Sequence, residues 1–199
     1  MVTSPVFPSL AFTLTITASY WCWVSFEAWI VARDRREVKG ESLDRSSFTW
    51  VIAWLVVGIV VGVFATPVLL PRCAIRNGVT PVFIAGIALV WAGILLRYWA
   101  IATLGRWFRS KVVIQEGHAL VTRGPYRYLR NPSYTGSLMT FLGFGLGVCN
   151  WLSVIVLSAT GLAAFSRRII VEDRALTGRF GREYQEYADR TWALLPFIW

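Results

Sequence analysis

Three long, nearly uncharged apolar blocks constrain the fold of this chain more than any other feature. They cover residues 8–32, 48–70 and 79–104, and the only charges in them are Glu27 in the first and Arg97 in the third. A helix of about 20 mainly apolar residues crosses the hydrocarbon layer of a bilayer. The blocks therefore predict three membrane-spanning helices. The composition, 56% hydrophobic and 16% charged, excludes a disordered chain.

Two shorter apolar runs follow, over 134–148 and 151–165, separated by Cys149 and Asn150. At about 15 residues each they are short for independent spans, so they predict a tight helical hairpin. The second arm gains length if it continues into the arginines that follow, whose long side chains can extend to the headgroups. The expected fold is an all-α integral-membrane bundle of about five transmembrane helices.

The basic residues are distributed very unevenly between the loops. Seventeen of the 20 Lys and Arg lie in the loop after the first block, in segment 105–132 or in the tail, whereas Arg72 and Arg76 lie in the loop between the second and third blocks. Because cytoplasmic loops carry the excess of Lys and Arg, we expect a multi-pass protein with its N-terminus outside and its C-terminus in the cytoplasm. No Lys or Arg precedes Arg33, so we expect the first helix to be retained rather than cleaved.

The net charge of +9 is compatible with anionic lipid and with nucleic acid. The basic and aromatic residues of segment 105–132 adjoin the apolar blocks, where headgroup contact explains them better, so we expect membrane lipid as a partner and no nucleic acid.

The chain shows no internal repeat or low-complexity linker, which predicts one membrane domain over residues 1–199. Within it, residues 1–103 would form three transmembrane helices. Residues 104–199 would form a catalytic half with a cofactor loop, the helical hairpin and a C-terminal cytoplasmic helix. The closely spaced Gly143, Gly145 and Gly147 lie inside an apolar helical run, so they indicate close helix packing rather than a nucleotide-binding loop.

Cysteine and histidine show no metal-ligand pattern. Cys22, Cys73 and Cys149 are far apart in the sequence, and His118 is the only histidine, so we expect no metal site. In the expected topology Cys73 and Cys149 both lie near the outer surface, and spacing alone leaves open whether they pair.

Three charged residues indicate a pocket near the inner face, because charges against a membrane bundle are costly unless they face a cavity or one another. They are Glu27, Arg97 and Glu172. Arg168 precedes Glu172 by four residues, which places both on one helix face. Two readings remain open at this point. The pair is either a surface ion pair or part of a pocket for a carboxylate-bearing substrate and an amine-bearing cofactor.

Three ordered segments together resemble the isoprenylcysteine carboxyl methyltransferase family, a group of integral-membrane, S-adenosylmethionine-dependent enzymes. They are GHALVTRGPYRYLRNPSYTG (117–136), RRIIVEDRAL (167–176) and FGREYQEYADR (180–190). The resemblance covers roughly residues 104–196, about half of the chain. Sterol reductases and phospholipid methyltransferases of membranes share a version of the Arg-x-Pro-x-Tyr-x-Gly stretch, and the tail segments favour the methyltransferases.

The resemblance implies a site, residue by residue. Arg168 would lie at the methyl acceptor and orient it as a guanidinium holding a carboxylate. The family usually has His where this chain has Asn131, and an Asn side chain does not titrate near neutrality. The residues implied in S-adenosylmethionine binding are His118, Ala119, Leu120, Val121, Tyr126, Asn131, Pro132, Ser133, Tyr134 and Glu172.

The expected function is methyl transfer from S-adenosylmethionine to a lipophilic acceptor such as the carboxylate of an isoprenylcysteine. An ionised carboxylate needs no general base, whereas an amine or thiol would, and His118 would then be the first candidate. A phospholipid or thiol methyltransferase, a membrane NADPH-dependent sterol-type reductase and a non-catalytic scaffold that binds anionic lipid remain open. The apolar, aromatic C-terminus, RTWALLPFIW (190–199), is expected to dock on the membrane or to fold back over the site.

Overall fold

The computed structural model describes residues 9–37, 46–108 and 119–195, without the side chains of 34–37 and 46–48. Within these ranges the chain is helical and forms only isolated β-bridges, so the predicted all-α class is confirmed. The long helices are α1 (Leu10–Glu37), α2 (Ser46–Gly58), α4 (Val79–Leu104), α5 (Pro132–Gly147) and α6 (Trp151–Phe180).

Short helical elements continue or connect the long helices. A π-helical stretch, η1, extends α2, and the remaining elements are single turns or short helices at the two ends of the bundle. They are η1 (Ile59–Ala65), α3 (Thr66–Leu69), η2 (Pro71–Cys73), η3 (Gly105–Trp107), η4 (Gly124–Arg127) and α7 (Arg182–Ala188).

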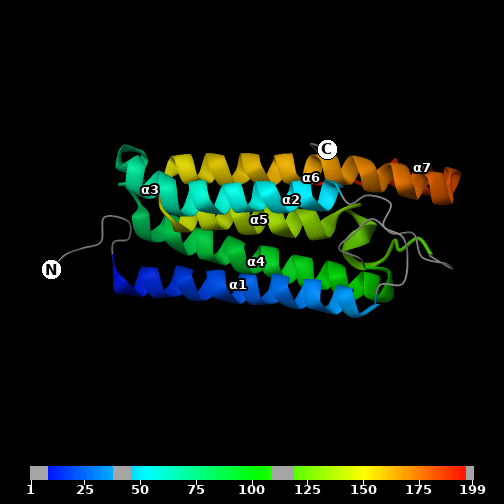
Figure 1. Cartoon of the computed structure of the whole chain (residues 1–199), viewed down its shortest axis with the longest axis horizontal. Helices are drawn as coiled ribbons and strands as arrows, with labels where there is room; N and C mark the ends of the chain where they lie inside the picture. The colour runs from blue at the N-terminus through cyan, green and yellow to red at the C-terminus, as the bar shows by residue number, and fades with distance from the viewer. Residues whose placement is uncertain (1–8, 38–45, 109–118, 196–199) are drawn as a thin grey trace.

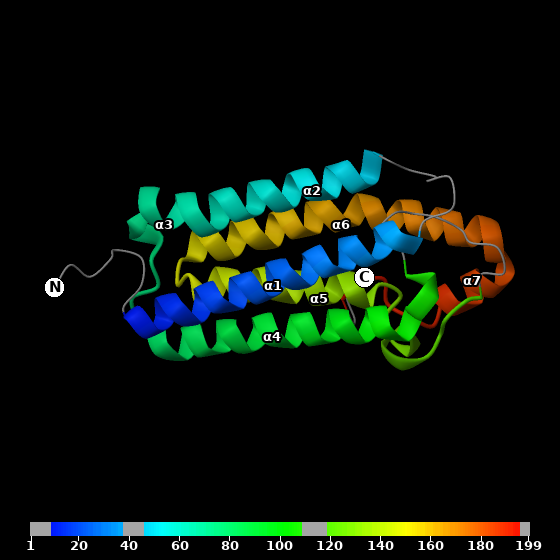
Figure 2. The same ribbon diagram turned by 60° about the horizontal axis from the view of Figure 1, so that its bottom comes forward.

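The five long helices run side by side along one axis (Figure 1). α4 packs on α5, α5 on α6 and α6 on α2, while α1 lies along α4. The turned view shows α1 crossing in front of α5, with α2 along the top of the view beside α6 (Figure 2). The elements η3, η4 and α7 gather at the end where α5 begins and α6 ends. This arrangement brings the polar segments of the C-terminal half to one end of the bundle.

Three helical stretches among the described residues are long and apolar enough to cross a membrane. They are Thr49–Leu69, Val79–Trp107 and Trp151–Phe180. The first two coincide with the helices predicted over 48–70 and 79–104.

The third stretch shows the extension that the sequence allowed for the second arm of the hairpin. The helix α6 continues past the arginines to a length of 30 residues, long enough to span by itself. The first apolar block forms α1, a helix of 28 residues that is not among the three stretches. α5 has 16 residues. A total of about five spans therefore stays a prediction.

The hairpin between α5 and α6 turns at the two residues that the sequence singled out. Asn150 caps α6, because its side-chain oxygen accepts hydrogen bonds from the amides of Leu152 and Ser153 at 3.0 and 3.2 Å. Cys149 adopts a left-handed φ of 54° and accepts a 2.8 Å hydrogen bond from the amide of Ile75. Cys149 is buried and Cys73 is partly buried, and both are free thiols.

Small residues allow α4 and α5 to pack closely. A Cβ added to Gly136 would lie 2.6 Å from the carbonyl oxygen of Gly93, and one added to Gly143 would lie 2.6 Å from the amide nitrogen of Val90. Both distances are too short for real atoms, so this face of α5 requires glycine. The interpretation of the closely spaced glycines as packing residues is therefore confirmed.

Candidate active site

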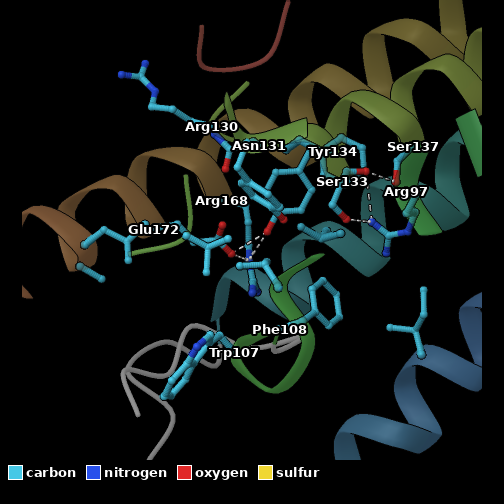
Figure 3. Close-up of a pocket in the computed structure, with 18 of the residues that line it drawn as sticks. Arg97, Trp107, Phe108, Arg130, Asn131, Ser133, Tyr134, Ser137, Arg168 and Glu172 are labelled. Atoms are coloured by element: carbon cyan, nitrogen blue, oxygen red, sulfur yellow. Dashed lines mark hydrogen bonds and ion pairs between the residues drawn. The ribbon is translucent and has the colours of Figure 1, made fainter. Parts of the chain in front are cut away.

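A cavity of about 230 Å³ lies at the end of the bundle where α5 begins and α6 ends. Its wall comes from α1, α2, α4, α5, α6, α7 and the turns η3 and η4. Figure 3 shows the polar side chains that face it, among them Arg97, Tyr134, Arg168 and Glu172. The three charged residues that the sequence marked as costly in a membrane, Glu27, Arg97 and Glu172, all line this cavity. The fold thus gives these charges one shared polar site.

Arg168, Glu172 and Tyr134 form a compact hydrogen-bonded cluster in the cavity wall (Figure 3). The Arg168 Nε donates to Glu172 Oε1 at 2.8 Å and lies 3.1 Å from the Tyr134 hydroxyl. The same hydroxyl donates to Glu172 Oε1 at 2.6 Å. The Tyr134 ring stacks on Phe165 with centroids 5.0 Å apart. Packing and hydrogen bonding together fix the position of the tyrosine.

The spacing of four residues places Arg168 and Glu172 on one face of α6, as the sequence predicted. The Arg168 side chain is only 3% exposed and the Glu172 side chain 23%. A surface ion pair would leave the arginine in solvent, so that reading is wrong. A cation this deeply buried needs a partner, and Glu172 supplies the compensating charge inside the cavity.

A second ion pair joins α1 to α4 across the same cavity. Arg97 Nη2 donates to Glu27 Oε2 at 3.0 Å, and Arg97 Nε lies 2.8 Å from Glu27 Oε1. Arg97 Nη1 donates to the Ser133 hydroxyl at 2.7 Å. Ser133 and Tyr134 are consecutive, so the first turn of α5 contacts both ion pairs. The positions of the two charged pairs are therefore coupled through this turn.

The C-terminal segment Arg190–Leu195, here called the strap, is fastened to the same turn of α5. The Asn131 side-chain amide donates to the Ala193 carbonyl at 2.9 Å, and the Thr135 hydroxyl donates to the Leu194 carbonyl at 2.6 Å. Ala193 and Leu194 are buried. The strap therefore folds back against the site, which is one of the two outcomes expected for the C-terminus. Residues 196–199 lie outside the described residues.

Backbone hydrogen bonds complete the attachment of the strap. The Arg130 amide donates to the Trp192 carbonyl at 2.8 Å, and the Trp192 amide donates to the Tyr128 carbonyl at 3.1 Å. Asn131 is the N-cap residue of α5, yet its side chain makes no capping bond. Its amide is used to hold the strap, which gives a physical role to the asparagine at this position.

Two tyrosines of α7 line the cavity beside the C-terminal end of α6. The Tyr187 hydroxyl donates to the Tyr126 carbonyl at 2.8 Å, and the Tyr184 hydroxyl donates a short hydrogen bond to the Asp173 carboxylate. Burial raises the pKa of Tyr187 to about 12. Burial, and secondarily the Asp173 carboxylate, raises the pKa of Tyr184. Burial and the nearby Glu172 charge raise the pKa of Tyr126. All three phenols are therefore neutral near pH 7.

Most of the residues implied by the sequence resemblance meet at the cavity, with three exceptions. Ala119 is exposed, and neither it nor the buried Pro132 is among the lining residues. His118 lies outside the described residues. The residues brought together are Leu120, Val121, Tyr126, Asn131, Ser133, Tyr134, Arg168 and Glu172.

Sequence reasoning missed the aromatic and aliphatic part of the wall. Trp107 and Phe108 follow α4, while Trp23, Phe141 and Phe165 come from α1, α5 and α6. In the sequence these residues differ in no way from other apolar residues of a membrane helix, so only their packing identifies them.

Comparison with known proteins points to one family. The family model described as isoprenylcysteine carboxyl methyltransferase (ICMT) matches residues 86–178. A probable protein-S-isoprenylcysteine O-methyltransferase of Oryza sativa subsp. indica is 38% identical over 115 residues, covering 57% of this chain and 60% of the relative. Protein-S-isoprenylcysteine O-methyltransferase B of Arabidopsis thaliana is 38% identical over 115 residues, covering 57% and 58%. The matched segment contains Arg168, Glu172 and the first turn of α5.

A solved structure shows a similar fold. It is described as the eukaryotic intramembrane Ras methyltransferase ICMT and matches with a TM-score of 0.60 and 25% identity. The match covers 78% of this chain and 55% of that one. This chain thus spans between 55% and 60% of these three proteins. The apolar helices and this likeness make it an integral membrane protein. Residues 86–178, just under half of this chain, are therefore similar to the isoprenylcysteine carboxyl methyltransferase family.

Proposed function

We propose that the protein transfers a methyl group from S-adenosylmethionine to the carboxylate of a lipophilic acceptor of the isoprenylcysteine type. One observation carries this proposal. The Arg168–Glu172–Tyr134 cluster lies inside the segment that matches the methyltransferase family, at a cavity with both polar and apolar walls. A polar end suits a charged methyl donor and a carboxylate, and an apolar end suits a hydrocarbon chain.

The chemistry of the lining residues fits S-adenosylmethionine. The donor carries an ammonium and a sulfonium, and Glu172 offers a carboxylate that is 23% exposed. Trp107, Phe108 and Tyr126 add aromatic surface of the kind on which an adenine ring stacks. Glu172, Leu120, Val121 and Tyr126 would hold the donor, and Arg168 would hold the acceptor.

When bound, S-adenosylmethionine supplies an electrophilic methyl group, whose C–S bond breaks as a C–O bond to the acceptor carboxylate forms, leaving a thioether and a methyl ester with no proton transferred. The protein therefore needs no base at the acceptor. Arg168 would orient the acceptor carboxylate, and Glu172 and Tyr134 hold the guanidinium in place. The surrounding apolar walls would exclude water.

We also propose that the whole chain is one membrane domain whose cavity end faces the cytoplasm. Among the described residues, most of the basic ones lie at that end, in the last turns of α1, in η3 and η4, and in the C-terminal part of α6 and in α7, while Arg72 and Arg76 lie near the opposite end. A water-soluble methyl donor would then enter from the cytoplasm and a lipid-like acceptor from the inner leaflet.

Titration calorimetry on the detergent-purified protein tests the donor class. S-adenosylhomocysteine, the expected product, is compared with NADPH, so that an acceptor is not needed. We expect S-adenosylhomocysteine to bind and Glu172→Gln to weaken its binding about tenfold or more, which is roughly 1.4 kcal/mol. Binding of NADPH in its place would favour the membrane reductase over the methyltransferase.

The chain offers a matched control for Glu172→Gln. Arg182 and Glu186 form an ion pair with the same spacing, with Nε and Oε1 2.9 Å apart, but their side chains are 89% and 53% exposed. Glu186→Gln should therefore leave the affinity for S-adenosylhomocysteine unchanged. Equal effects of Glu172→Gln and Glu186→Gln would contradict the assignment of Glu172 to the donor site.

A further inference from the structure

The guanidinium of Arg97 lines the cavity, yet all of its nitrogens contact partners within the protein. Its Nε and Nη2 atoms lie 2.8 and 3.0 Å from the two carboxylate oxygens of Glu27. Its Nη1 donates to the hydroxyl of Ser133 at 2.7 Å and to the carbonyl of the same residue at 3.3 Å. Figure 3 shows the Arg97 side chain directed at Ser133. Arg97 therefore connects parts of the bundle to one another.

Glu27 supplies the negative charge of this pair from α1. Arg97 and Ser133 lie inside the segment that matches the family model, whereas Glu27 lies outside it. The Arg97 side chain is 12% exposed, so the cation needs a neutralising partner. Glu172 is the other carboxylate among the described residues that line the cavity. An Arg97 released from Glu27 would therefore be attracted to Glu172 or to the carboxylate of a bound acceptor.

Apolar contacts hold α1 on the bundle without this ion pair. Phe12 of α1 stacks on Phe83 of α4 with ring centroids 4.0 Å apart, and Trp23 meets Phe141 of α5 edge to face at 5.7 Å. Charges inside a membrane bundle are costly. Replacing a buried ion pair by apolar side chains of similar volume often leaves stability unchanged or increases it. The advantage of a charged pair here therefore lies in the geometry that it imposes on the site.

Ser133 connects this pair to the groups proposed to act on the substrates. It is 6% exposed and lies in the first turn of α5. The next residue, Tyr134, donates its 2.6 Å hydrogen bond to Glu172 on α6. At the same level α5 packs directly on α4, since a Cβ added to Gly136 would lie 2.8 Å from the amide nitrogen of Arg97. A change in the position of the Arg97 side chain would therefore shift the first turn of α5.

We propose that Glu27 is a positioning residue for methyl transfer, acting through Arg97 on the first turn of α5. The inference rests on the proposed function. In this role Glu27 touches neither the methyl donor nor the acceptor. Its carboxylate keeps Arg97 on Ser133, and this contact keeps Tyr134 aligned with the charged groups of α6. Because the reacting atoms must be held close and in line, loss of the alignment lowers kcat more than it raises KM.

The kinetics of ester formation test this inference. The substrates are labelled S-adenosylmethionine and N-acetylcysteine carrying an S-farnesyl group. Glu27→Gln removes the charge and should lower kcat about tenfold. In a Ser133→Ala background, Glu27→Gln should lower kcat about threefold at most, because only the longer contact to the carbonyl of residue 133 remains. The control, Glu186→Gln, removes the carboxylate of an exposed ion pair on α7 and should keep the wild-type kcat.

A second variant separates the position of the site from the stability of the protein. The double substitution Glu27→Leu and Arg97→Met replaces the ion pair by apolar side chains of similar volume. The midpoint of thermal unfolding in detergent should stay the same or rise. We expect kcat to fall about tenfold nevertheless, because the contact to Ser133 is lost. This variant keeps the inference testable if Glu27→Gln does not fold.

The outcomes distinguish this inference from the proposed function. A wild-type kcat in the apolar double variant would overturn the positioning role. Equal losses from Glu27→Gln with and without Ser133→Ala would also overturn it, and would show that Glu27 contacts a ligand directly. In both cases the wild-type protein still forms the ester, so the proposed function stands. A wild-type protein that forms no ester would reject the proposed function, and the positioning role with it.

Discussion

Tyr134 donates a 2.6 Å hydrogen bond to Glu172, and its hydroxyl oxygen lies 3.1 Å from the Arg168 Nε. One phenol at the start of α5 thus contacts both charged groups on α6. The adjacent Ser133 binds Arg97, so a single turn of α5 connects the two ion pairs of the cavity. The ring packing of Tyr134 on Phe165 keeps this hydroxyl in place. We infer that the hydroxyl positions Glu172 and Arg168 relative to each other.

Tyr134→Phe should lower methyl-transfer activity while preserving the packed ring. A hydrogen bond to a charged group contributes about 1.5–3 kcal/mol. Its loss should reduce kcat/KM roughly 10- to 100-fold. The measurement is the initial rate of ester formation. Tyr128→Phe, at a tyrosine that is 58% exposed, is the control and should retain full activity. Equal rates in Tyr134→Phe and wild type would show that the hydroxyl does not position the pair.

Asn131→Asp should release the strap. The carboxylate cannot donate to the Ala193 carbonyl, and a buried acceptor without a partner costs about 1–3 kcal/mol. We therefore expect faster trypsin cleavage after the exposed Arg190, followed by mass spectrometry. Asn77→Asp makes the same chemical change at an exposed residue near the opposite end and should leave cleavage at Arg190 unchanged. A strap equally protected in Asn131→Asp would contradict this role of the amide.

The attachment of α7 should weaken at high pH. Burial raises the pKa of Tyr187 to about 12 from its ordinary value of 10.0. The unfolded state therefore loses the proton first as the pH rises, so the stabilising contribution is complete below about pH 10 and is lost toward about pH 12. The free energy of unfolding in detergent should fall over this interval. Tyr187→Phe should be less stable at neutral pH and should show a shallower fall.

Tyr184 continues to titrate in Tyr187→Phe, so part of the pH dependence of the free energy of unfolding remains. Tyr128→Phe again serves as the control, and its slope should equal that of wild type. The same slope in Tyr187→Phe would show that Tyr187 does not contribute to the dependence.

The hydropathy of the sequence predicted a helix correctly where one uninterrupted apolar block is long enough to form it. Residues 79–104 were expected as a span and form α4 with those bounds. Asn150 was expected at the hairpin turn, and it caps α6 there. The extension of α6 past residue 165 was allowed for, but its end at Phe180 was not predicted. Arg167 and Arg168 end the apolar run, but an arginine side chain can stay in a helix when a carboxylate one turn later accepts its hydrogen bonds, as Glu172 does.

The sequence predicted site residues only where a charged residue lies in an apolar membrane block or where a motif resembles that of a known family. Glu27 and Arg97 are conspicuous in apolar blocks, yet nothing in the sequence pairs them, because their contact depends on how α1 lies along α4. Asn131 was expected at the methyl donor and lines the cavity, and its side-chain amide also holds the strap. A hydrogen bond between residues 62 positions apart has no local sequence signal.

Transfer of a labelled methyl group from S-adenosylmethionine to S-prenylated N-acetylcysteine tests the central claim most directly. The purified wild-type protein and Glu186→Gln should form the methyl ester, and Arg168→Lys should lose about a hundredfold or more, because an ammonium cannot replace the guanidinium fork. The carboxamide analogue of the acceptor, which has no carboxylate, should not react. The absence of ester with the wild-type protein, or equal rates in Arg168→Lys and wild type, would contradict the account.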